Sequence, residues 1–194
     1  GATDTTVATD TADGGRAEIL SLDLLSPTAS DTLAALAVAA PIQIFVHCAG
    51  GQRDMPFAAM SREDWHDIVD LNLNTLFAAL QPLMLPMMRA RWGRVVAVSS
   101  LAAITGNRGQ SNYAAAKGGM LAMMKSLARE YGGRGITANV VAPGLIDTSE
   151  TRVLKNYSEL IALSPAERAG TPAEVAALVA FLASEAAGYI SGQM

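Results

Sequence analysis

Uninterrupted apolar runs alternate along this chain with longer stretches in which apolar positions recur every three or four residues. The uninterrupted runs are typical of strands that are buried on both faces of a parallel sheet. The longer stretches are typical of amphipathic helices that cover such a sheet. The elements predicted in this way are strands over residues 5–10, 16–23, 42–47, 95–98 and 136–141, and helices from Ser30 or Asp31 to about Ala40, from Arg62 onward, from about Ser111 to Tyr131, and from Pro172 to Leu182.

The order of these elements predicts the fold class. Strands that alternate with helices form a parallel sheet through crossover connections, which place helices on both faces. We therefore expect an α/β fold, a Rossmann-like doubly wound sheet in a three-layer α/β/α arrangement. A barrel of eight such units would need about 250 residues. Because the chain has 194 residues, a single domain over 1–194 is the simplest prediction.

Local signals place several helix ends. Ser61 followed by Asp64 resembles a capping box, in which each side chain bonds to a free backbone amide of the first turn. Ser30 or Asp31 can cap the earlier helix in a similar way. The glycine-rich residues 132–135 should end the helix that contains Tyr113.

Two other stretches interrupt the helical pattern. Pro82 and Pro86 should kink or punctuate the helix that begins at Arg62, because proline cannot donate the backbone hydrogen bond of a helix interior. Residues 149–170 are polar and loosely patterned, so no regular element is predicted there.

Composition excludes several classes of function. The chain is 51% hydrophobic and 16% charged, with a net charge of −4 and no basic run, which argues against a nucleic-acid partner. One cysteine and two histidines make a zinc site improbable, and the lone Cys48 fits a reducing compartment. The sequence shows no apolar run of about 18 residues and no signal peptide. We therefore expect a cytoplasmic protein without a membrane span.

The candidate chemistry lies in Ser100, Tyr113 and Lys117. Tyr113 and Lys117 are four positions apart, so a helix would place them on one face. Ser100 follows a predicted buried strand, and ligands of open α/β sheets bind at the carboxyl ends of strands. An ammonium about 4 Å from a phenol, at an effective dielectric near 20, favours the phenolate by about 4 kcal/mol before desolvation opposes it. Tyr113 could thus exchange a proton with a ketone oxygen near neutral pH, while Ser100 holds that oxygen.

Other interpretations of these residues remain open. Tyr113 and Lys117 could instead be a pair on the surface of an amphipathic helix, with no chemical role. Ser100 at the predicted strand end favours the catalytic interpretation. An activated nucleophile made from His47 and Cys48 has little support, since adjacent strand residues point to opposite faces.

Three segments resemble the short-chain dehydrogenase/reductase family, above all its 3-oxoacyl-(acyl-carrier-protein) reductase branch. These segments are residues 106–117, Gly-Asn-Arg-Gly-Gln-Ser-Asn-Tyr-Ala-Ala-Ala-Lys; residues 125–130, Lys-Ser-Leu-Ala-Arg-Glu; and residues 135–148, Gly-Ile-Thr-Ala-Asn-Val-Val-Ala-Pro-Gly-Leu-Ile-Asp-Thr. The resemblance implies NAD(P)H-dependent reduction of a carrier-bound 3-oxoacyl thioester to its 3-hydroxyacyl form, in fatty acid or polyketide-like synthesis.

The resemblance also assigns roles to individual residues. It makes Tyr113 the proton donor, Ser100 the residue that orients the carbonyl, and Lys117 the ligand of the nicotinamide ribose. Asn72 matches an asparagine that holds a proton-relay water. The cofactor-binding positions implied by the resemblance, in addition to Tyr113 and Lys117, are Asp23 and Leu24 beside the adenine, Cys48, Ala49 and Gly50 in the turn after the third predicted strand, and Pro143, Gly144, Ile146 and Thr148 around the nicotinamide amide.

The resemblance further implies partners. Arg91 and Arg134 match basic positions that dock the acidic carrier protein, although two exposed arginines are more often only solvated charge. Family members usually form tetramers through the two long helices, which here begin at about Arg62 and Ser111. We expect a homotetramer or a homodimer on this basis.

Two departures from the family pattern affect the cofactor. The turn Asn-Asn-Ala-Gly is His47-Cys48-Ala49-Gly50 here, so two asparagine side chains are absent. The glycine-rich turn that receives the pyrophosphate is not found near the amino terminus, where Gly1-Ala2-Thr3 resembles only its beginning. We therefore expect the first strand and its turn to be missing, and the domain to be incomplete at both ends.

The choice of nicotinamide cofactor rests on conflicting signals. The branch generally uses NADPH, which we expect here. Asp10, if it ends the second strand of the fold, would instead favour NADH, because its carboxylate repels a 2′-phosphate.

Alternatives to the thioester reductase also remain. The same site could serve an alcohol, sugar or steroid dehydrogenase, since 149–168 contains no residue that decides the substrate. The absent glycine-rich turn would also fit a non-catalytic subunit of the same fold that pairs with an active partner.

Overall fold

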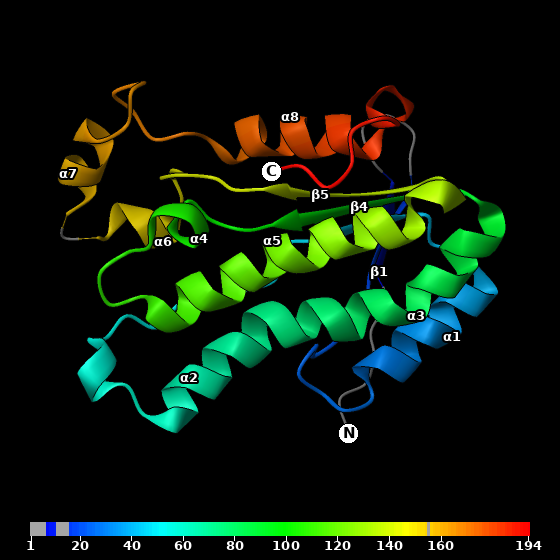
Figure 1. Cartoon of the computed structure of the whole chain (residues 1–194), viewed down its shortest axis with the longest axis horizontal. Helices are drawn as coiled ribbons and strands as arrows, with labels where there is room; N and C mark the ends of the chain where they lie inside the picture. Colours follow the sequence, from blue (N-terminus) through cyan, green and yellow to red (C-terminus); the bar gives the residue numbers. More distant parts are fainter. Residues whose placement is uncertain (1–6, 11–15, 155) are drawn as a thin grey trace.

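A computed structural model describes residues 7–10, 16–154 and 156–194; residues 1–6, 11–15 and 155 lie outside the described part. Its centre is a parallel sheet with the strand order β3-β4-β5, drawn edge-on in Figure 1. The strands are β3 (Ile44–His47), β4 (Gly93–Val98) and β5 (Ile136–Val141). Their uninterrupted apolar sequences place them in the interior, as predicted, and every residue of β5 is buried.

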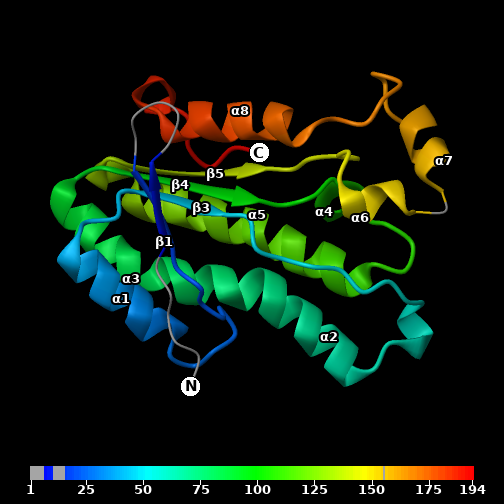
Figure 2. The same ribbon diagram turned by 180° about the vertical axis from the view of Figure 1, so that it is seen from behind.

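Helices cover both faces of this sheet, which confirms the predicted three-layer α/β/α fold. One layer contains α1, α2, α3 and α5, and the opposite layer contains α8 (Figures 1 and 2). The bounds of these helices are α1 (Ala29–Ala39), α2 (Arg62–Val69), α3 (Thr75–Ala90), α5 (Ser111–Tyr131) and α8 (Pro172–Ala183).

Two hydrophobic clusters hold the layers together. The larger lies between the sheet and the layer of α3 and α5, where Leu76, Leu80 and Met120 pack beside β4 and β5. The smaller lies between the sheet and α8, where Val96 and Val141 meet Leu182. Because β4 contributes to both clusters, its position and the site at its end are fixed from two sides.

The ends of the helices agree only partly with the sequence signals. The capping box of Ser61 and Asp64 is present at the start of α2. The expected cap at Ser30 or Asp31 is wrong, because α1 already begins at Ala29, after a turn in which the Thr28 amide donates to Ser26 Oγ. This earlier turn leaves no role for a capping side chain inside the helix.

The long amphipathic stretch after Ser61 is also less regular than predicted. Between α2 and α3 lies a wider, π-helical turn, η2 (Asp70–Asn74). Pro82 and Pro86 lie inside α3 and neither ends it. The irregularity of this stretch thus lies at η2, several residues before the prolines that were expected to cause it.

The segment from α2 to α3 also passes a length-and-composition test for a membrane span. Its most apolar 18-residue window, within Arg62–Ala90, has a mean hydropathy of 1.3, and 44% of that window is buried inside the protein. Core helices of soluble proteins meet the same criterion, and this one packs against α1, α5 and β4. The expectation that the chain has no membrane span therefore stays a prediction.

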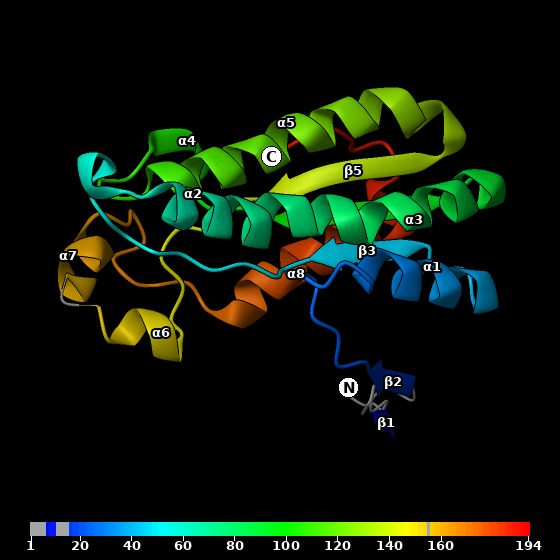
Figure 3. The same cartoon turned by 90° about the horizontal axis from the view of Figure 1, so that it is seen from below.

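The amino-terminal strands differ most from the prediction. The strands β1 (Val7–Asp10) and β2 (Arg16–Ile19) pair with each other in antiparallel register, as a hairpin outside the parallel sheet. Figure 3 shows this hairpin beside the main body. Only five residues join the two strands, whereas a parallel pair needs a crossover of about a dozen or more. Asp10 therefore does not end a strand of the parallel sheet.

The loosely patterned residues 149–170 contain two short helices that the sequence did not indicate. They are α6 (Ser149–Arg152) and α7 (Tyr157–Ala162). The remaining short elements are η1 (Phe57–Ala59), α4 (Ala102–Thr105), η3 (Gly132–Arg134) and η4 (Glu185–Ala187). The loops at the carboxyl ends of β3, β4 and β5 lead into η1, α4 and α6, respectively.

Candidate active site

Ser100 and Tyr113 meet at the carboxyl end of β4. The strand ends at Val98, and the backbone amide of Ser99 continues the ladder by donating to Val141 at 2.7 Å. The hydroxyl of Ser99 donates to the carbonyl of Lys117 at 2.9 Å, which fixes α5 against the strand end. Tyr113, one turn earlier on α5, interacts with the hydroxyl of Ser100 through a hydrogen bond. The structure therefore brings these predicted residues together.

Lys117 lies on the same face of α5 as Tyr113, as the spacing predicts. Its ammonium is 5.7 Å from the centre of the Tyr113 ring. It donates to the carbonyl of Val98 at 3.0 Å, and its side chain is almost fully buried. Burial lowers the pKa of Lys117 to about 8, because the charged form loses its hydration.

The expected lowering of the Tyr113 pKa is not seen. Burial raises the pKa of Tyr113, the hydrogen bond with Ser100 opposes that rise, and the negative charge of Asp54 adds to it. The ammonium of Lys117 donates to Val98 and lies beside the ring of Tyr113. The loss of hydration, which opposes the phenolate, is the largest influence on the pKa of Tyr113.

Asn72 lies at the centre of the wide turn η2 and is fully buried. Its amide nitrogen donates to the carbonyls of Ile68 and Gly51, both at 2.8 Å. A methyl group added to Gly50 would lie 2.5 Å from Asn72 Oδ1 and 3.1 Å from the ammonium of Lys117. Gly50 thus keeps free the space between Asn72 and Lys117.

The residues of the turn after β3 have different environments. His47 is buried and its ring stacks on Phe45, with centroids 6.2 Å apart. Cys48 is exposed. The opposite orientation of these neighbours agrees with the geometry of a strand and gives no Cys–His nucleophile. Burial, followed by the charge of Lys117, lowers the pKa of His47 to about 4, so the imidazole is neutral at physiological pH.

A polar cluster near Tyr113 was not predicted from the sequence. The amide nitrogen of Gln110 donates to the carboxylate of Asp54 at 2.9 Å and to Gln52 at 3.2 Å. The buried side chain of Asn112 accepts from the backbone amide of Tyr113 at 2.8 Å and donates to the carbonyl of Asp64 at 3.2 Å. These contacts join the loop after β3 and helix α2 to the start of α5. No sequence signal identifies them, because the partners are about 50 positions apart.

The predicted nicotinamide loop follows β5. The carbonyl of Pro143 accepts from the amide of Leu101 at 2.9 Å, which ties this loop to the loop of Ser100. Gly144 has open space where a side chain would begin. Ile146 forms an isolated parallel bridge with Gly170. The loops after β4 and β5 thus lie side by side, as the predicted site requires.

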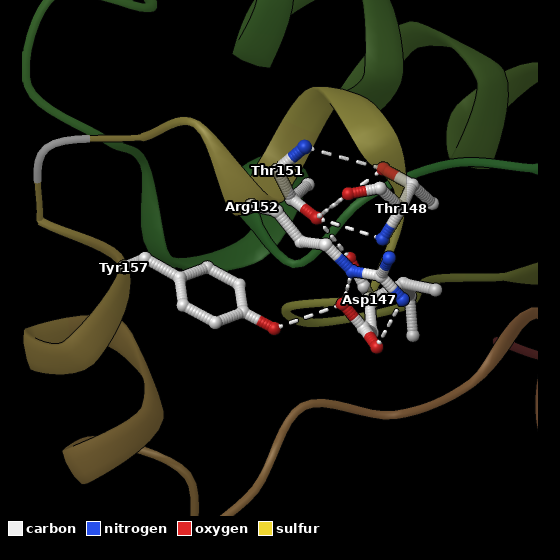
Figure 4. A network of polar contacts seen from close by, with 6 residues as sticks. Asp147, Thr148, Thr151, Arg152 and Tyr157 are labelled. Carbon is white, nitrogen blue, oxygen red and sulfur yellow. Dashed lines mark hydrogen bonds and ion pairs between the residues drawn. The ribbon is translucent and has the colours of Figure 1, made fainter.

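Beyond Ile146, a polar clasp holds the start of α6 (Figure 4). Thr148 and Thr151 form a capping box. The carboxylate of Asp147 accepts from Arg152 at 2.6 and 2.9 Å and from the hydroxyl of Tyr157 at 3.1 Å. The bond with Arg152 is the main reason that the pKa of Asp147 lies below its usual value. This clasp links Thr148, a predicted cofactor residue, to α7.

Two surface hollows lie near these elements. One, of about 410 Å³, lies beside the nicotinamide loop and is mainly apolar; its lining includes Ile104, Pro143, Ile146 and Leu178. The other, of about 350 Å³, lies at the start of α2, and its lining includes Phe57, Met60 and Trp65. The sulfur of Met60 contacts the hydroxyl of Ser111 at 3.9 Å, which brings the second hollow near the start of α5.

Three sets of predicted residues lie elsewhere or are incompletely described. Asp23 is exposed and accepts from the amide of Leu25 at 2.9 Å, as a turn residue before α1, with Leu24 between them. Gly1-Ala2-Thr3 lies outside the described residues, and Asp10 is described only in its backbone. None of these positions tests the predicted adenine and pyrophosphate contacts.

Arg91 and Arg134 lie near the amino ends of β4 and β5, whereas Ser100 follows the carboxyl end of β4. Arg91 follows α3 and donates to the carbonyl of Gly133 at 3.3 Å, and Arg134 ends η3, one residue before β5 begins. The part of α5 (Ser111–Tyr131) that follows Tyr113, about 27 Å of helix, separates this end from Tyr113. Within one chain, the predicted carrier-docking residues and the predicted catalytic residues are not neighbours.

Comparisons with known proteins identify the relatives of this chain. A family model described as "Enoyl-(Acyl carrier protein) reductase" matches residues 2–194. The chain is 46% identical to the 3-oxoacyl-(acyl-carrier-protein) reductase FabG of Escherichia coli, and 45% identical to that of Salmonella typhimurium, each over 154 residues. It is 44% identical to nodulation protein G of a Rhizobium species over the same length. Each alignment covers 78% of this chain and 63% of the relative, so the chain spans less than two thirds of these proteins.

Proposed function

Because this chain belongs to the short-chain dehydrogenase/reductase family, we propose that the protein reduces a carrier-bound 3-oxoacyl thioester to the 3-hydroxyacyl form, as a step of fatty acid or polyketide-like synthesis. The reductant we propose is NADPH, with NADH as the alternative. The observation that carries the proposal is the meeting of Ser100, Tyr113 and Lys117 at the carboxyl end of β4. Relatives named 3-oxoacyl-(acyl-carrier-protein) reductases support the substrate class.

The side chains fit a reaction in which a carbonyl oxygen gains a proton. In the proposed reaction the hydroxyls of Ser100 and Tyr113 both donate to the substrate oxygen. As negative charge grows on this oxygen, Tyr113 transfers its proton to it. The raised pKa of Tyr113 keeps the phenol protonated at neutral pH, which suits the direction of reduction.

Lys117 and Asn72 act on the same proton. The ammonium of Lys117 favours the phenolate that remains after the transfer, because opposite charges attract strongly where water is excluded. Among the described residues, Val98 accepts from one of its three N–H groups, and the other two can serve the ribose of a cofactor and a relay of protons. Asn72 lies beside it across the space that Gly50 leaves free.

The residues around this space fit the nicotinamide half of a dinucleotide, whose role is to supply the hydride. A side chain at Gly50 would collide with Asn72 Oδ1 and crowd the ammonium of Lys117. We propose that Lys117, Ala49 and the loop from Pro143 to Thr148 hold that half. The described residues give no corresponding support for the pyrophosphate or for the choice between NADPH and NADH.

Partners form the remaining part of the proposal. We propose a cytoplasmic homotetramer or homodimer that assembles through α2, α3 and α5. Because Arg91 and Arg134 lie far from Tyr113 along α5, a carrier protein that docks on them would deliver its acyl chain to the site of a second copy. Equilibrium sedimentation would test the assembly. Reversing both charges should raise KM for a carrier-bound substrate and not for a small thioester.

The test of the reaction follows the loss of reduced cofactor with acetoacetyl thioester as substrate. We expect turnover with NADPH, and a loss of at least about a hundredfold in kcat for Tyr113→Phe, because a positioned general acid contributes that much or more. Tyr189→Phe is the matched control, since Tyr189 is fully exposed. Near-normal turnover by Tyr113→Phe would refute the assignment.

The same assay separates the alternatives. A crotonyl thioester tests enoyl reduction, the activity for which the matching family model is named, and simple ketones, sugars and steroids test the other dehydrogenases. If neither NADPH nor NADH binds in a titration of the complete polypeptide, the non-catalytic subunit is the better interpretation.

A further inference from the structure

Polar contacts tie the loop after β3 to the loop before α5. The carboxylate of Asp54 accepts from the amide nitrogen of Gln110 through both of its oxygens, at 2.9 and 3.0 Å. The same nitrogen also donates to Gln52 at 3.2 Å. The amide oxygen of Gln110 accepts from the side chain of Asn107 at 3.0 Å. Both polar atoms of this buried side chain therefore have partners, which fix its orientation.

Gln110 connects these contacts to Tyr113, which follows three residues later. Its carbonyl accepts from the backbone amide of Ala114 at 2.7 Å, within the first turn of α5. The backbones of the two loops are also joined directly, since the amide of Met55 donates to the carbonyl of Gly109 at 2.8 Å. Tyr113 lies in this first turn, so its position depends on how the loop after β3 holds Gln110.

Asp54 also brings a negative charge close to Tyr113. Within the described residues its carboxylate is in no ion pair; the neighbouring Arg53 pairs instead with two carboxylates of α2, those of Asp64 and Asp67, at 2.9 and 3.2 Å. Burial is the main reason that the pKa of Tyr113 is raised, and the charge of Asp54 adds to that rise. A negative charge beside a phenol has this effect because it disfavours the phenolate.

Other charged or titratable groups lie on the segments around Tyr113. They are Cys48, Arg53 and Asp54 of the loop after β3, Arg108 of the loop before α5, Asp147 of the loop after β5, Arg62, Glu63, Asp64, His66 and Asp67 of α2, Asp70 of η2, Arg134 of η3, and Lys117, Lys125, Arg129, Glu130 and Tyr131 of α5. The elements β5 and α4, which also pack against α5, contain none. Beside burial and the hydrogen bond with Ser100, the charge that acts on the Tyr113 phenol is that of Asp54.

We propose that Asp54 is a positioning residue of the reaction, which fixes the first turn of α5 through Gln110 and holds a negative charge beside the phenol of Tyr113. This role rests on the proposed function, because it concerns the proton that Tyr113 gives to the substrate. The charge keeps the proton on the phenol before the transfer and favours its return afterwards. At a given pH it thus favours reduction, which needs the phenol, over the reverse oxidation, which needs the phenolate.

Two variants separate the charge of Asp54 from its hydrogen bonds. Asp54→Asn removes the charge and keeps an oxygen that accepts from Gln110, whereas Gln110→Leu removes the hydrogen bonds and keeps the charge. In Asp54→Asn the phenol of Tyr113 should titrate at lower pH than in the wild-type protein. The measurement is the ultraviolet absorbance of the phenolate, assigned to Tyr113 by its loss in Tyr113→Phe.

Salt and a distant carboxylate provide the controls for this titration. Because Asp54 is exposed, salt screens its charge, so high salt should reduce the difference between Asp54→Asn and the wild-type protein. Asp31→Asn removes an exposed carboxylate of α1 and should leave the titration of Tyr113 unchanged. A titration of Tyr113 that is the same in folded Asp54→Asn and in the wild-type protein would overturn the proposal.

Kinetics test the two parts of the role separately. For reduction, kcat/KM falls at high pH as Tyr113 loses its proton, and this fall should begin at lower pH in Asp54→Asn. Gln110→Leu should lower kcat by about tenfold, since a misplaced group can cost up to about a hundredfold, and the fall should stay at the wild-type pH. A purely structural role would lower the melting temperature of both variants and move neither the titration nor the pH profile.

The outcomes keep this proposal apart from the proposed function. The titration of the phenol needs no turnover, so it decides whether Asp54 acts on Tyr113 even if the wild-type protein reduces no thioester and the proposed function fails. If Gln110→Leu does not fold, Asp54→Asn at low and high salt decides. A raised KM of Asp54→Asn with an unchanged pH profile would show that Asp54 contacts the substrate instead, and would refute the positioning role.

Discussion

Replacing Gly50 by alanine is the most direct test of how tightly the site is packed. The new methyl group would lie 2.5 Å from Asn72 Oδ1, whereas ordinary contacts begin at 3.4 Å, so one of the two must move by about 0.9 Å. Asn72 has little freedom to move, because its amide is held at 2.8 Å by both Gly51 and Ile68. Breaking two such bonds at about 1 kcal/mol each gives a loss of about 2 kcal/mol, within the usual cost of overpacking of about 1–3 kcal/mol.

The measurement is chemical denaturation of the wild-type protein and Gly50→Ala, together with kcat for the thioester. We expect the free energy of unfolding to fall by about 2 kcal/mol and kcat to fall with it, since Asn72 and Lys117 are displaced. The matched control is Gly132→Ala, where nothing lies within 4 Å of the added atom and the backbone is already helical. It should be neutral or stabilising by about 0.4–1 kcal/mol. If Gly50→Ala is as harmless as this control, the turn yields and the reasoning is wrong.

Two further predictions concern charged groups. Lys117→Met should abolish turnover, yet the variant should be more stable than the wild-type protein at pH 7. The pKa of the buried ammonium falls from 10.5 to about 8, so this group opposes folding by about 3 kcal/mol. The gain in stability is smaller than this figure, because the variant also loses the hydrogen bond to Val98. Between pH 8 and 10.5 the unfolded chain keeps a proton that the folded chain has released, so the stability of the wild-type protein rises with pH. Above pH 10.5 the variant should no longer be the more stable of the two. A difference in stability that persists there would contradict this cause. Asp147→Asn should loosen the clasp with Arg152 and Tyr157. We expect faster amide exchange over residues 147–154 and a higher KM, with kcat changed by less than about twofold. Unchanged exchange would show that the clasp does not order these residues.

The sequence alone determined the layers of the fold and the pairing of Tyr113 with Lys117. Uninterrupted apolar runs are buried on both faces wherever they lie, so β4 and β5 could be placed before any contact was known. A spacing of four on a helix fixes two side chains on one face in the same way. These features depend on residues close in the chain, which is why pattern and spacing were sufficient.

Tertiary structure decided the environment of those residues. Whether the pKa of Tyr113 rises or falls depends on how much water surrounds it, and burial by distant segments is the main cause of its rise. The antiparallel pairing of β1 with β2 and the distance of Arg91 from Tyr113 likewise depend on where strands lie in space. None of these quantities is a function of local sequence.

The wide turn at Asn72 shows the same division most clearly. The sequence predicts a helix through this residue and gives no sign of the π-helical turn that directs its amide toward Gly51. That turn packs against α5 and leaves Asn72 Oδ1 buried beside the space at Gly50, which also borders the ammonium of Lys117. Sequence determined which polar residues the chain contains, and only packing decided which of them share one buried space, because burial is a property of the whole fold.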